Sequence, residues 1–220
     1  MLENYTHEID KIRKSIKHIL NSILKANEIF LIAVKKCDIQ KFDEAKSYLK
    51  NISSKIESID NEIIKILALY TPEARDLREV VAYFKIDNEL LRVVSNSRKL
   101  IKGFKDNCFV LDESIVNEYV MPLQISTVRT IENSIKMIGL DNSDELKDIY
   151  HAVMVEEDKT DELYMLLEKK IFESLKNIND FAKIHNILRV FRRSEKIADR
   201  TMSIANLLLY IQEGGTLKRI

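Results

Sequence analysis

Carboxylates in the last two predicted helices are the residues whose type and spacing best suit chemistry. Glu195 occupies a position in the apolar stripe of the last helix, and Asp199 follows one turn later on the same side. The stripe recurs at steps of three and four: Ile184, Leu188, Phe191, Glu195, Ala198, Met202, Ala205 and Leu209. A carboxylate on a packing face needs a partner, which is either a cationic side chain or a metal ion.

A second group of acids interrupts the apolar stripe of the preceding helix. That stripe stops after Val153 and resumes at Thr160. The acids at the interruption are Glu156, Glu157, Asp158 and Asp161. Hard oxygen ligands gathered from neighbouring helices suit magnesium, manganese or iron, and zinc is a further candidate. We therefore expect any metal to be held at a single carboxylate site formed by four side chains: Glu195, Asp199, Asp158 and Asp161.

Salt bridging is the competing interpretation of these acids. Cationic side chains are plentiful in the last helix: Arg189, Arg192, Arg193 and Lys196. Acid pairs four residues apart are common on solvated helix faces, so spacing alone does not distinguish an ion-pair network from a metal site.

No other combination of residues indicates chemistry. The chain has no Gly-rich phosphate loop, HExxH, CxxC or GxSxG motif, and no two of its four histidines share a helical turn. We expect no catalytic residue, no organic cofactor and no enzymatic activity.

The charge balance bears on partners. Lys and Arg number 35, as do Asp and Glu, so the formal net charge is zero. A nucleic-acid-binding protein usually carries a basic surplus, and we expect no nucleic-acid partner. The mixture of 32% charged and 45% hydrophobic residues is typical of helices that are apolar on one face.

The cysteines and the amino terminus bear on location. Cys37 and Cys108 are far apart in sequence, without metal-ligand spacing, and we expect both to remain thiols in a reducing compartment. The first residues are polar and acidic, unlike a signal peptide. No apolar run approaches the ~20 residues of a membrane span. We predict a cytoplasmic protein without direct membrane insertion.

The elements that must position the acids are helices. Four Gly and two Pro compare with roughly 15 and 11 at average usage, which excludes folds with many tight turns. Apolar residues follow helical spacing from Tyr5 to Ile23, and again from Phe42 to Tyr70 in what reads as one long helix. We predict an all-α fold of long helices packed side by side at shallow angles.

Punctuation divides the chain into six helices. Breaks fall at Cys37, at Pro72 (expected at the first helical position), at Gly103, at Gly139 and near Asp180. Ser143 is the expected cap of the fifth helix, which should run to about Lys176, and Pro122 should kink the fourth helix or mark its start. Three long helices, a break and three more predict two tandem repeats in one compact unit: 1–104, a linker at 105–112, and 113–220.

Three segments resemble signatures of the PhoU family, and the resemblance spans nearly the whole chain. Asp60 with PEARDLR at 72–78 resembles the family's Pro-x-Ala-x-Asp-Leu-Arg segment, which is the most specific part. The segment DKTDELY at 158–164 resembles Asp-x-x-Val-Asp-x-Leu-Tyr. The segment SEKIAD at 194–199 resembles Leu-Glu-Arg-Ile-Gly-Asp in the last helix.

The resemblance implies two three-helix bundles related by a pseudo-twofold axis. It implies a cytoplasmic accessory regulator of phosphate uptake that contacts a phosphate ABC transporter ATPase and a sensor histidine kinase. A homodimer and metal clusters bound by a Glu/Asp-x-x-x-Asp motif in each repeat are further family properties. Asp76 and Arg78 are expected to stabilise the start of the third helix or to contact a partner.

The sequence also departs from the family pattern. The first-repeat counterparts of Glu195 and Asp199 are Leu91 and Ser95, so both acids are missing there. In the second repeat Arg200 replaces a usual His, Ser203 a usual Asn and Asn206 a usual Glu. We therefore expect one metal site or none in place of a pair of clusters.

Three functions follow. The leading hypothesis is a PhoU-like regulator of phosphate uptake and phosphate-starvation signalling that acts through protein contacts along helical faces. The second is a PhoU-like accessory or scaffold protein of another transport system that no longer serves phosphate signalling. The third is a helical-bundle carboxylate metalloprotein, which would favour paired Glu-x-x-His motifs that this chain lacks.

Overall fold

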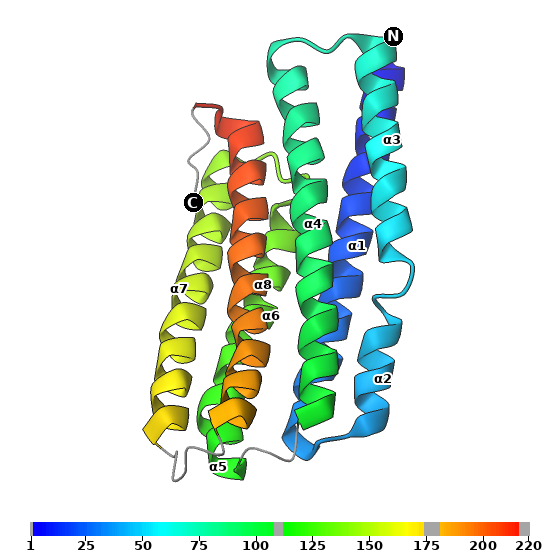
Figure 1. Ribbon diagram of the computed structural model, residues 1–220. Helices are drawn as coiled ribbons and strands as arrows, with labels where there is room; N and C mark the ends of the chain where they lie inside the picture. Colours follow the sequence, from blue (N-terminus) through cyan, green and yellow to red (C-terminus); the bar gives the residue numbers. More distant parts are fainter. Residues whose placement is uncertain (1, 108–111, 174–180, 216–220) are drawn as a thin grey trace.

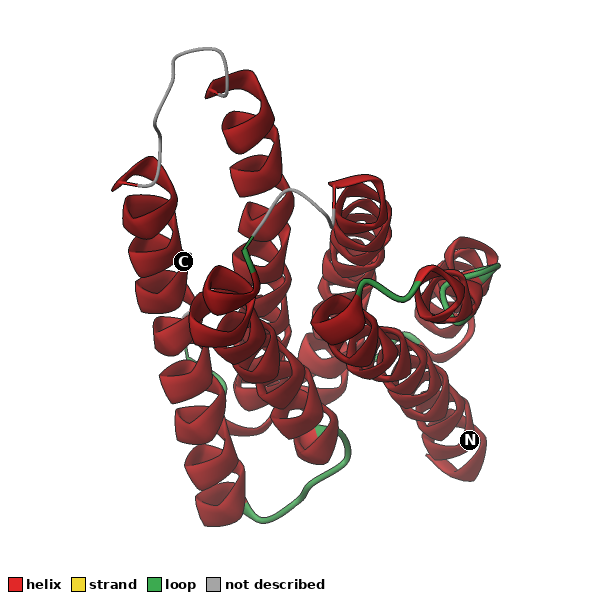
Figure 2. Ribbon diagram, turned by 90° about the horizontal axis from the view of Figure 1, so that it is seen from below, coloured by secondary structure: helices red, strands yellow, loops and turns green. Residues whose placement is uncertain are grey.

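The protein consists of helices, as seen in a computed structural model that describes residues 2–107, 112–173 and 181–215 (Figure 1). The helices are α1 (Leu2–Lys36), α2 (Ile39–Ser47), α3 (Ile52–Tyr70), α4 (Ala74–Asn107), α5 (Glu113–Ile115), the π-helix η1 (Val116–Val120), α6 (Met121–Met137), α7 (Ser143–Glu173) and α8 (Phe181–Glu213). No strand occurs among these residues (Figure 2). Within the same ranges, no helix is long and apolar enough to cross a membrane.

Six long helical segments result when α2 is grouped with α3, and α5 and η1 with α6. The first three segments form one bundle and the last three a second beside it (Figure 1). Corresponding helices meet between the bundles, because α4 packs along α8 and α1 along α6. The all-α fold of two tandem three-helix bundles is confirmed. Residues 105–107 of the predicted linker are helical.

The second apolar stripe is buried as predicted, but the single long helix expected over it is wrong. Phe42 and Ile66, near its ends, are at most 1% exposed. Between α2 and α3 the chain turns at 48–51, where Asn51 has a φ of 60°. Asn tolerates this left-handed conformation better than most residues. Arg98 of α4 donates from Nη2 to the Leu49 carbonyl at 2.6 Å and satisfies backbone that the break exposes.

Two predicted boundaries of α4 are wrong. The helix begins at Ala74, so Pro72 lies before it and is not its first residue. It continues past Gly103 to Asn107, so this glycine does not end a helix. A Cβ at Gly103 would lie 2.5 Å from Cγ2 of Val190 on α8, and the missing side chain therefore allows close helix contact. Close packing explains this glycine better than helix punctuation does.

The starts of α6 and α7 in the second repeat differ from simple helix starts. Pro122 is the second residue of α6, but helical backbone already runs from Glu113 through η1, so Pro122 does not mark the start of this segment. Its missing N–H removes one helical hydrogen bond, and π-helical turns are found at such defects. Asn142, not the predicted Ser143, caps α7, because its Oδ1 accepts from the Asp144 and Glu145 amides. The expected helix boundaries at Lys176 and Asp180 lie outside the described residues.

The predicted thiol state of Cys37 is also wrong. Cys37 is disulfide-bonded at the end of α1, while Cys108 lies outside the described residues. The rings of Phe30 and Phe104 are 5.7 Å apart, which places the end of α1 beside the end of α4. Sequence separation does not reveal this proximity, so cysteine usage no longer supports a reducing compartment.

A buried chain of hydrogen bonds connects the two repeats. Ser194 Oγ of α8 donates to Gln124 Oε1 of α6 at 3.0 Å, and Gln124 Nε2 donates to Asn27 Oδ1 of α1 at 3.2 Å. Asn27 Nδ2 donates in turn to Ser97 Oγ of α4, also at 3.2 Å. All four side chains are at most 1% exposed. Each of the four central helices thus contributes one polar group, and each group depends on its neighbours for a partner.

Replacing Gln124 with Leu should destabilise the protein by about 2–4 kcal/mol, because the variant leaves Asn27 and Ser194 buried without their partner at similar side-chain volume. Urea denaturation followed by circular dichroism measures the change. Gln40→Leu, at an exposed position of α2, is the control and should change stability by less than about 0.5 kcal/mol. Equal stability of Gln124→Leu and the unmodified protein would contradict a structural role for this chain of hydrogen bonds.

Candidate metal centre

The acidic cluster lies where α7 packs against α8. The buried face of α7 includes Val153, Thr160 and Tyr164, whose spacing also places Glu157 on that face. Thr160 is fully buried, and its Oγ1 satisfies its hydrogen-bonding capacity by donating to the Glu157 carbonyl at 2.8 Å. The fold therefore presents α7 carboxylates directly to α8.

Three carboxylates converge at this contact. Glu157 and Asp161 of α7 and Asp199 of α8 each place one oxygen within 4.8 Å of the others. Asp161 and Asp199 are two of the four predicted ligands, so the structure brings these two together. Glu157 was not among the predicted four.

Glu195, the third predicted ligand, lies one turn before Asp199 and is 8% exposed. Lys196 Nζ donates to Glu195 Oε1 at 3.2 Å and to Asp199 Oδ2 at 2.9 Å. Arg192 Nε approaches Glu195 Oε2 only to 3.7 Å, and that buried oxygen has no hydrogen-bond partner. The cluster thus contains the predicted salt bridges through Lys196 and Arg192. Glu195 Oε2 can still accept a hydrogen bond or bind a cation.

Asp158, the fourth predicted ligand, is exposed and lies outside the group of converging oxygens. Glu156 turns toward α6, where its Oε1 is 3.7 Å from Arg129 Nη1, and the same oxygen pairs with Lys159 Nζ of α7 at 2.9 Å. The signal that could have selected Glu157 is its place four residues after Val153 and four before Asp161. Both Glu156 and Glu157 fit the broken stripe, and only the positions of α6 and α8 separate them.

Burial and mutual repulsion raise the proton affinity of the cluster. Burial, followed by the charges of Asp161 and Asp199, raises the pKa of Glu157 to about 7. The pKa of Asp161 is raised by burial and by Asp199, although Lys196 opposes the shift. Glu195 has a raised pKa for the same two reasons, burial and Asp199. Carboxylates that resist ionising together are stabilised by an added positive charge.

The residues present fit a divalent cation. The donors are hard carboxylate oxygens from two helices, which magnesium, manganese and ferrous iron prefer. Glu195 Oε2 is a buried acceptor without a hydrogen bond. A cation would also compete with the Lys196 ammonium for Asp199, so the lysine side chain has to move when metal binds.

Comparison with known proteins finds relatives that align with nearly the whole chain. No protein-family profile matches the chain. It is 25% identical over 211 residues to the phosphate-specific transport system accessory protein PhoU homolog of Aquifex aeolicus, covering 95% of this chain and 91% of that protein. The PhoU homolog of Borreliella burgdorferi is 23% identical, with 90% and 97% covered.

Solved structures agree with the sequence relatives. The crystal structure of the phosphate transport system regulatory protein PhoU from Streptococcus pneumoniae has a TM-score of 0.80 at 19% identity, over 98% of this chain and all of that one. PhoU from Pseudomonas aeruginosa has a TM-score of 0.83 at 18% identity, over 96% and 100%. The chain is a relative of the PhoU proteins.

The first repeat of this PhoU relative is built differently from the second. Leu91 and Ser95 occupy the positions where the sequence comparison expected acids, and Leu91 is 38% exposed. One turn earlier, Asp87 is 1% exposed, and neither of its carboxylate oxygens has a hydrogen-bond partner. Burial, followed by the charges of Asp60 and Glu62 on α3, raises the pKa of Asp87 to about 8. A proton on Asp87 relieves this repulsion without any metal.

The PhoU-like segment at 72–78 joins the ends of the two repeats. Arg78 donates from Nε and Nη2 to the Ile211 carbonyl at 3.3 and 3.1 Å, near the C-terminus of α8. A guanidinium suits that end of a helix, where free carbonyls accumulate. Asp76 is exposed in the first turn of α4, and its carbonyl accepts from Tyr5 Oη at 3.3 Å. Arg78 thus fixes α4 to the other repeat, while the Asp76 carboxylate faces solvent.

Asp199→Asn and Asp161→Asn should each weaken Mn²⁺ binding by about tenfold or more, because each removes a converging charged ligand. Isothermal titration calorimetry of the full chain measures the affinity. Glu162→Gln removes the adjacent exposed charge and should leave affinity within about twofold. Equal losses in all three variants would show general charge attraction in place of a defined site.

Asp87→Asn should stabilise the protein increasingly as pH rises. The folded state holds a proton on Asp87 that the unfolded chain releases near pH 4, so ionisation lowers the free energy of unfolding between about pH 4 and 8. The variant should gain roughly 1–3 kcal/mol over the unmodified protein at pH 8.5 and much less at pH 5. Urea denaturation at both values tests this, with exposed Asp106→Asn as control. A gain that is the same at both pH values would contradict the assignment.

Proposed function

We propose that this protein is a PhoU-like accessory regulator of phosphate uptake. The observation that carries the proposal is that relatives named phosphate-specific transport system accessory proteins align with nearly the whole chain. These alignments cover both repeats, and the chain has an acidic cluster between α7 and α8. In this role the protein contacts a phosphate ABC transporter ATPase and a sensor histidine kinase, and it performs no catalysis. Its place of action is the cytoplasm, where such partners present their soluble domains.

The outer face of α4 supports the proposed protein contacts. Leu77, Phe84 and Leu91 recur every seven residues, and Val81 lies between them on the same side. All four are 38–45% exposed in the described chain. A stripe of this kind is the pattern by which one helix packs against another. We assign this stripe to the transporter or kinase contact.

The acidic cluster is the second part of the proposal. A divalent cation between α7 and α8 would neutralise several carboxylates and fix the separation of these helices. Manganese, magnesium, iron and zinc all form divalent cations that would offset the negative charge of these carboxylates. Hard oxygen donors favour the first three. Such a cation would act structurally, because Glu157 and Asp161 lie on α7 and Asp199 lies on α8.

The loss of acids at Leu91 and Ser95 favours one alternative. In this alternative, a PhoU-like protein without these two acids serves as an accessory or scaffold protein of another transport system. In that case the α4 stripe would bind a different transporter, and phosphate would have no effect on the interaction.

Affinity capture from cells grown with ample or scarce phosphate distinguishes the two. We expect a phosphate transporter ATPase or a histidine kinase to be recovered, with an amount that depends on phosphate supply. Phe84→Glu should reduce recovery at least about fivefold, because it places a charge in the apolar stripe. Leu166→Glu, on an exposed part of α7, is the matched control and should leave recovery unchanged. Recovery of only an unrelated transporter in both media would support the alternative.

A further inference from the structure

The contact between α4 and α8 forms a cavity that is open to solvent and lined mainly by cations and amides, with Lys99, Asn186 and Arg189 exposed. Its volume is about 470 Å³. The lining residues are Lys99 and Asn107 of α4 with Asn186, Arg189, Val190 and Arg193 of α8. No carboxylate is among these lining residues. The cavity lies between the two repeats, because α4 belongs to the first and α8 to the second.

Helical spacing gathers these side chains on facing surfaces. Lys99, Gly103 and Asn107 recur every four residues on α4, so they share one face. On α8, steps of three and four residues place Asn186, Arg189 and Arg193 on one face. At the centre, the missing side chain of Gly103 leaves room for Val190, which would otherwise collide with a Cβ at 2.5 Å. This close approach brings cations from two helices together.

The three cations of the cavity lack acidic partners in the described part of the chain. Arg193 donates from Nη1 to the neutral Asn96 Oδ1 at 3.2 Å, and neither Lys99 nor Arg189 forms an ion pair there. Arg192 and Lys196, on other faces of the same helix, are the ones that pair with Glu195 and Asp199. Like charges gathered at a helix contact repel each other, and an anion between them removes the repulsion.

We propose that this cavity binds a multivalent phosphate-type oxyanion. Guanidinium groups donate paired N–H bonds that match phosphate oxygens, and the lysine and two amides add further donors. Three positive charges exceed what a single carboxylate neutralises, whereas a phosphate or diphosphate group carries two or more negative charges. The volume lies in the range of small-molecule sites. This site is separate from the acidic cluster and does not depend on the function proposed above.

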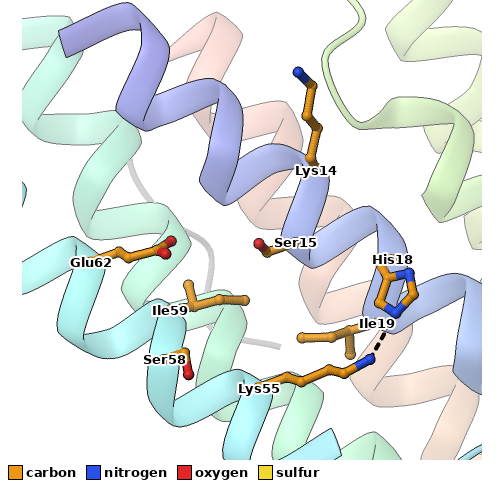
Figure 3. A pocket seen from close by; sticks show the side chains of 8 residues that line it. All are labelled: Lys14, Ser15, His18, Ile19, Lys55, Ser58, Ile59 and Glu62. Atoms are coloured by element: carbon orange, nitrogen blue, oxygen red, sulfur yellow. Dashed lines mark hydrogen bonds between the residues drawn. The ribbon is translucent and has the colours of Figure 1, made fainter. Parts of the chain in front are cut away.

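A second cavity with cations is less suited to an anion. It lies between α1 and α3, has a volume of about 300 Å³, and includes Lys55, His18 and Glu62 in its lining (Figure 3). Lys55 Nζ already contacts His18 Nε2 at 2.8 Å, and the Glu62 carboxylate lies across the cavity from them. An anion placed there would meet that negative charge.

Titration of the full chain with inorganic pyrophosphate tests the proposal. Isothermal titration calorimetry at constant ionic strength should show saturable binding that is tighter than binding of sulfate. Lys99→Met, Arg189→Met and Arg193→Met should each weaken it at least about fivefold, because each removes a charge-assisted donor. Lys102→Met is the matched control, since this exposed lysine of α4 lies outside the lining. It should change the affinity by less than about twofold.

Thermal unfolding provides a readout that does not depend on the titration. Pyrophosphate should raise the midpoint of the unmodified protein and leave that of Arg189→Met/Arg193→Met unchanged. Without anion, this double variant should unfold at the same temperature as the unmodified protein or higher, since it lacks the repulsion. That result would also show that the variant is folded.

Four results would overturn the proposal. The first is the absence of heat and of any midpoint shift at 10 mM pyrophosphate, a concentration well above what a specific site requires. The second is an equal loss of affinity in Lys102→Met, and the third is equal affinity for sulfate, which would mark an adventitious ion only. The fourth is preferential binding of a poly-glutamate peptide or of phosphatidic acid vesicles in parallel sedimentation assays, which would assign the cavity to a macromolecule or a membrane surface.

Discussion

A chain of hydrogen bonds buried among α1, α4, α6 and α8 determines how the two repeats meet. Apolar stripes alone would allow these helices to slide past one another, because Ile and Leu side chains pack in many registers. The amide of Gln124 must reach Asn27 on one side and Ser194 on the other, and a shift of one turn would leave buried polar atoms unpartnered. Positions elsewhere on α4 and α8, including the metal and anion candidates, follow from this alignment.

Much of this architecture is visible in the sequence, and the part that is not has identifiable causes. Helical spacing correctly predicted the buried faces of α1 and α3, because burial there depends only on each helix's own periodicity. The prediction that Gly103 ends a helix was wrong because glycine occurs both at helix ends and at close helix contacts. Only the position of Val190 distinguishes these two roles. The same limit applies to the candidate site. Asp161 and Asp199 were predicted together, whereas Glu157 was missed, because Glu156 and Glu157 both fit the broken stripe and differ in which neighbouring helix they face.

Asp87 and Cys37 show a further limit of sequence reasoning. Asp87 looks like an ordinary surface acid of an amphipathic helix, yet the packing of α3 places Asp60 and Glu62 beside it and removes water. Cys37 looks isolated, yet the ends of α1 and α4 are adjacent. For Asp87 the decisive neighbours belong to another helix. The sequence of one helix shows which of its residues are apolar or charged. Contacts with other helices determine how far those residues are buried and which groups lie beside them.

Helix α8 joins these features because each of its faces has a separate partner. Ser194 reaches the buried chain of hydrogen bonds, Arg193 faces α4, and Asp199 faces α7. A cation between α7 and α8 and an anion between α4 and α8 would therefore act on opposite sides of one rigid element. Because buried hydrogen bonds fix the register of α8, a ligand on either side would act on the helix as a whole. Two binding events on this helix would then be coupled through its orientation, without any contact between the ligands.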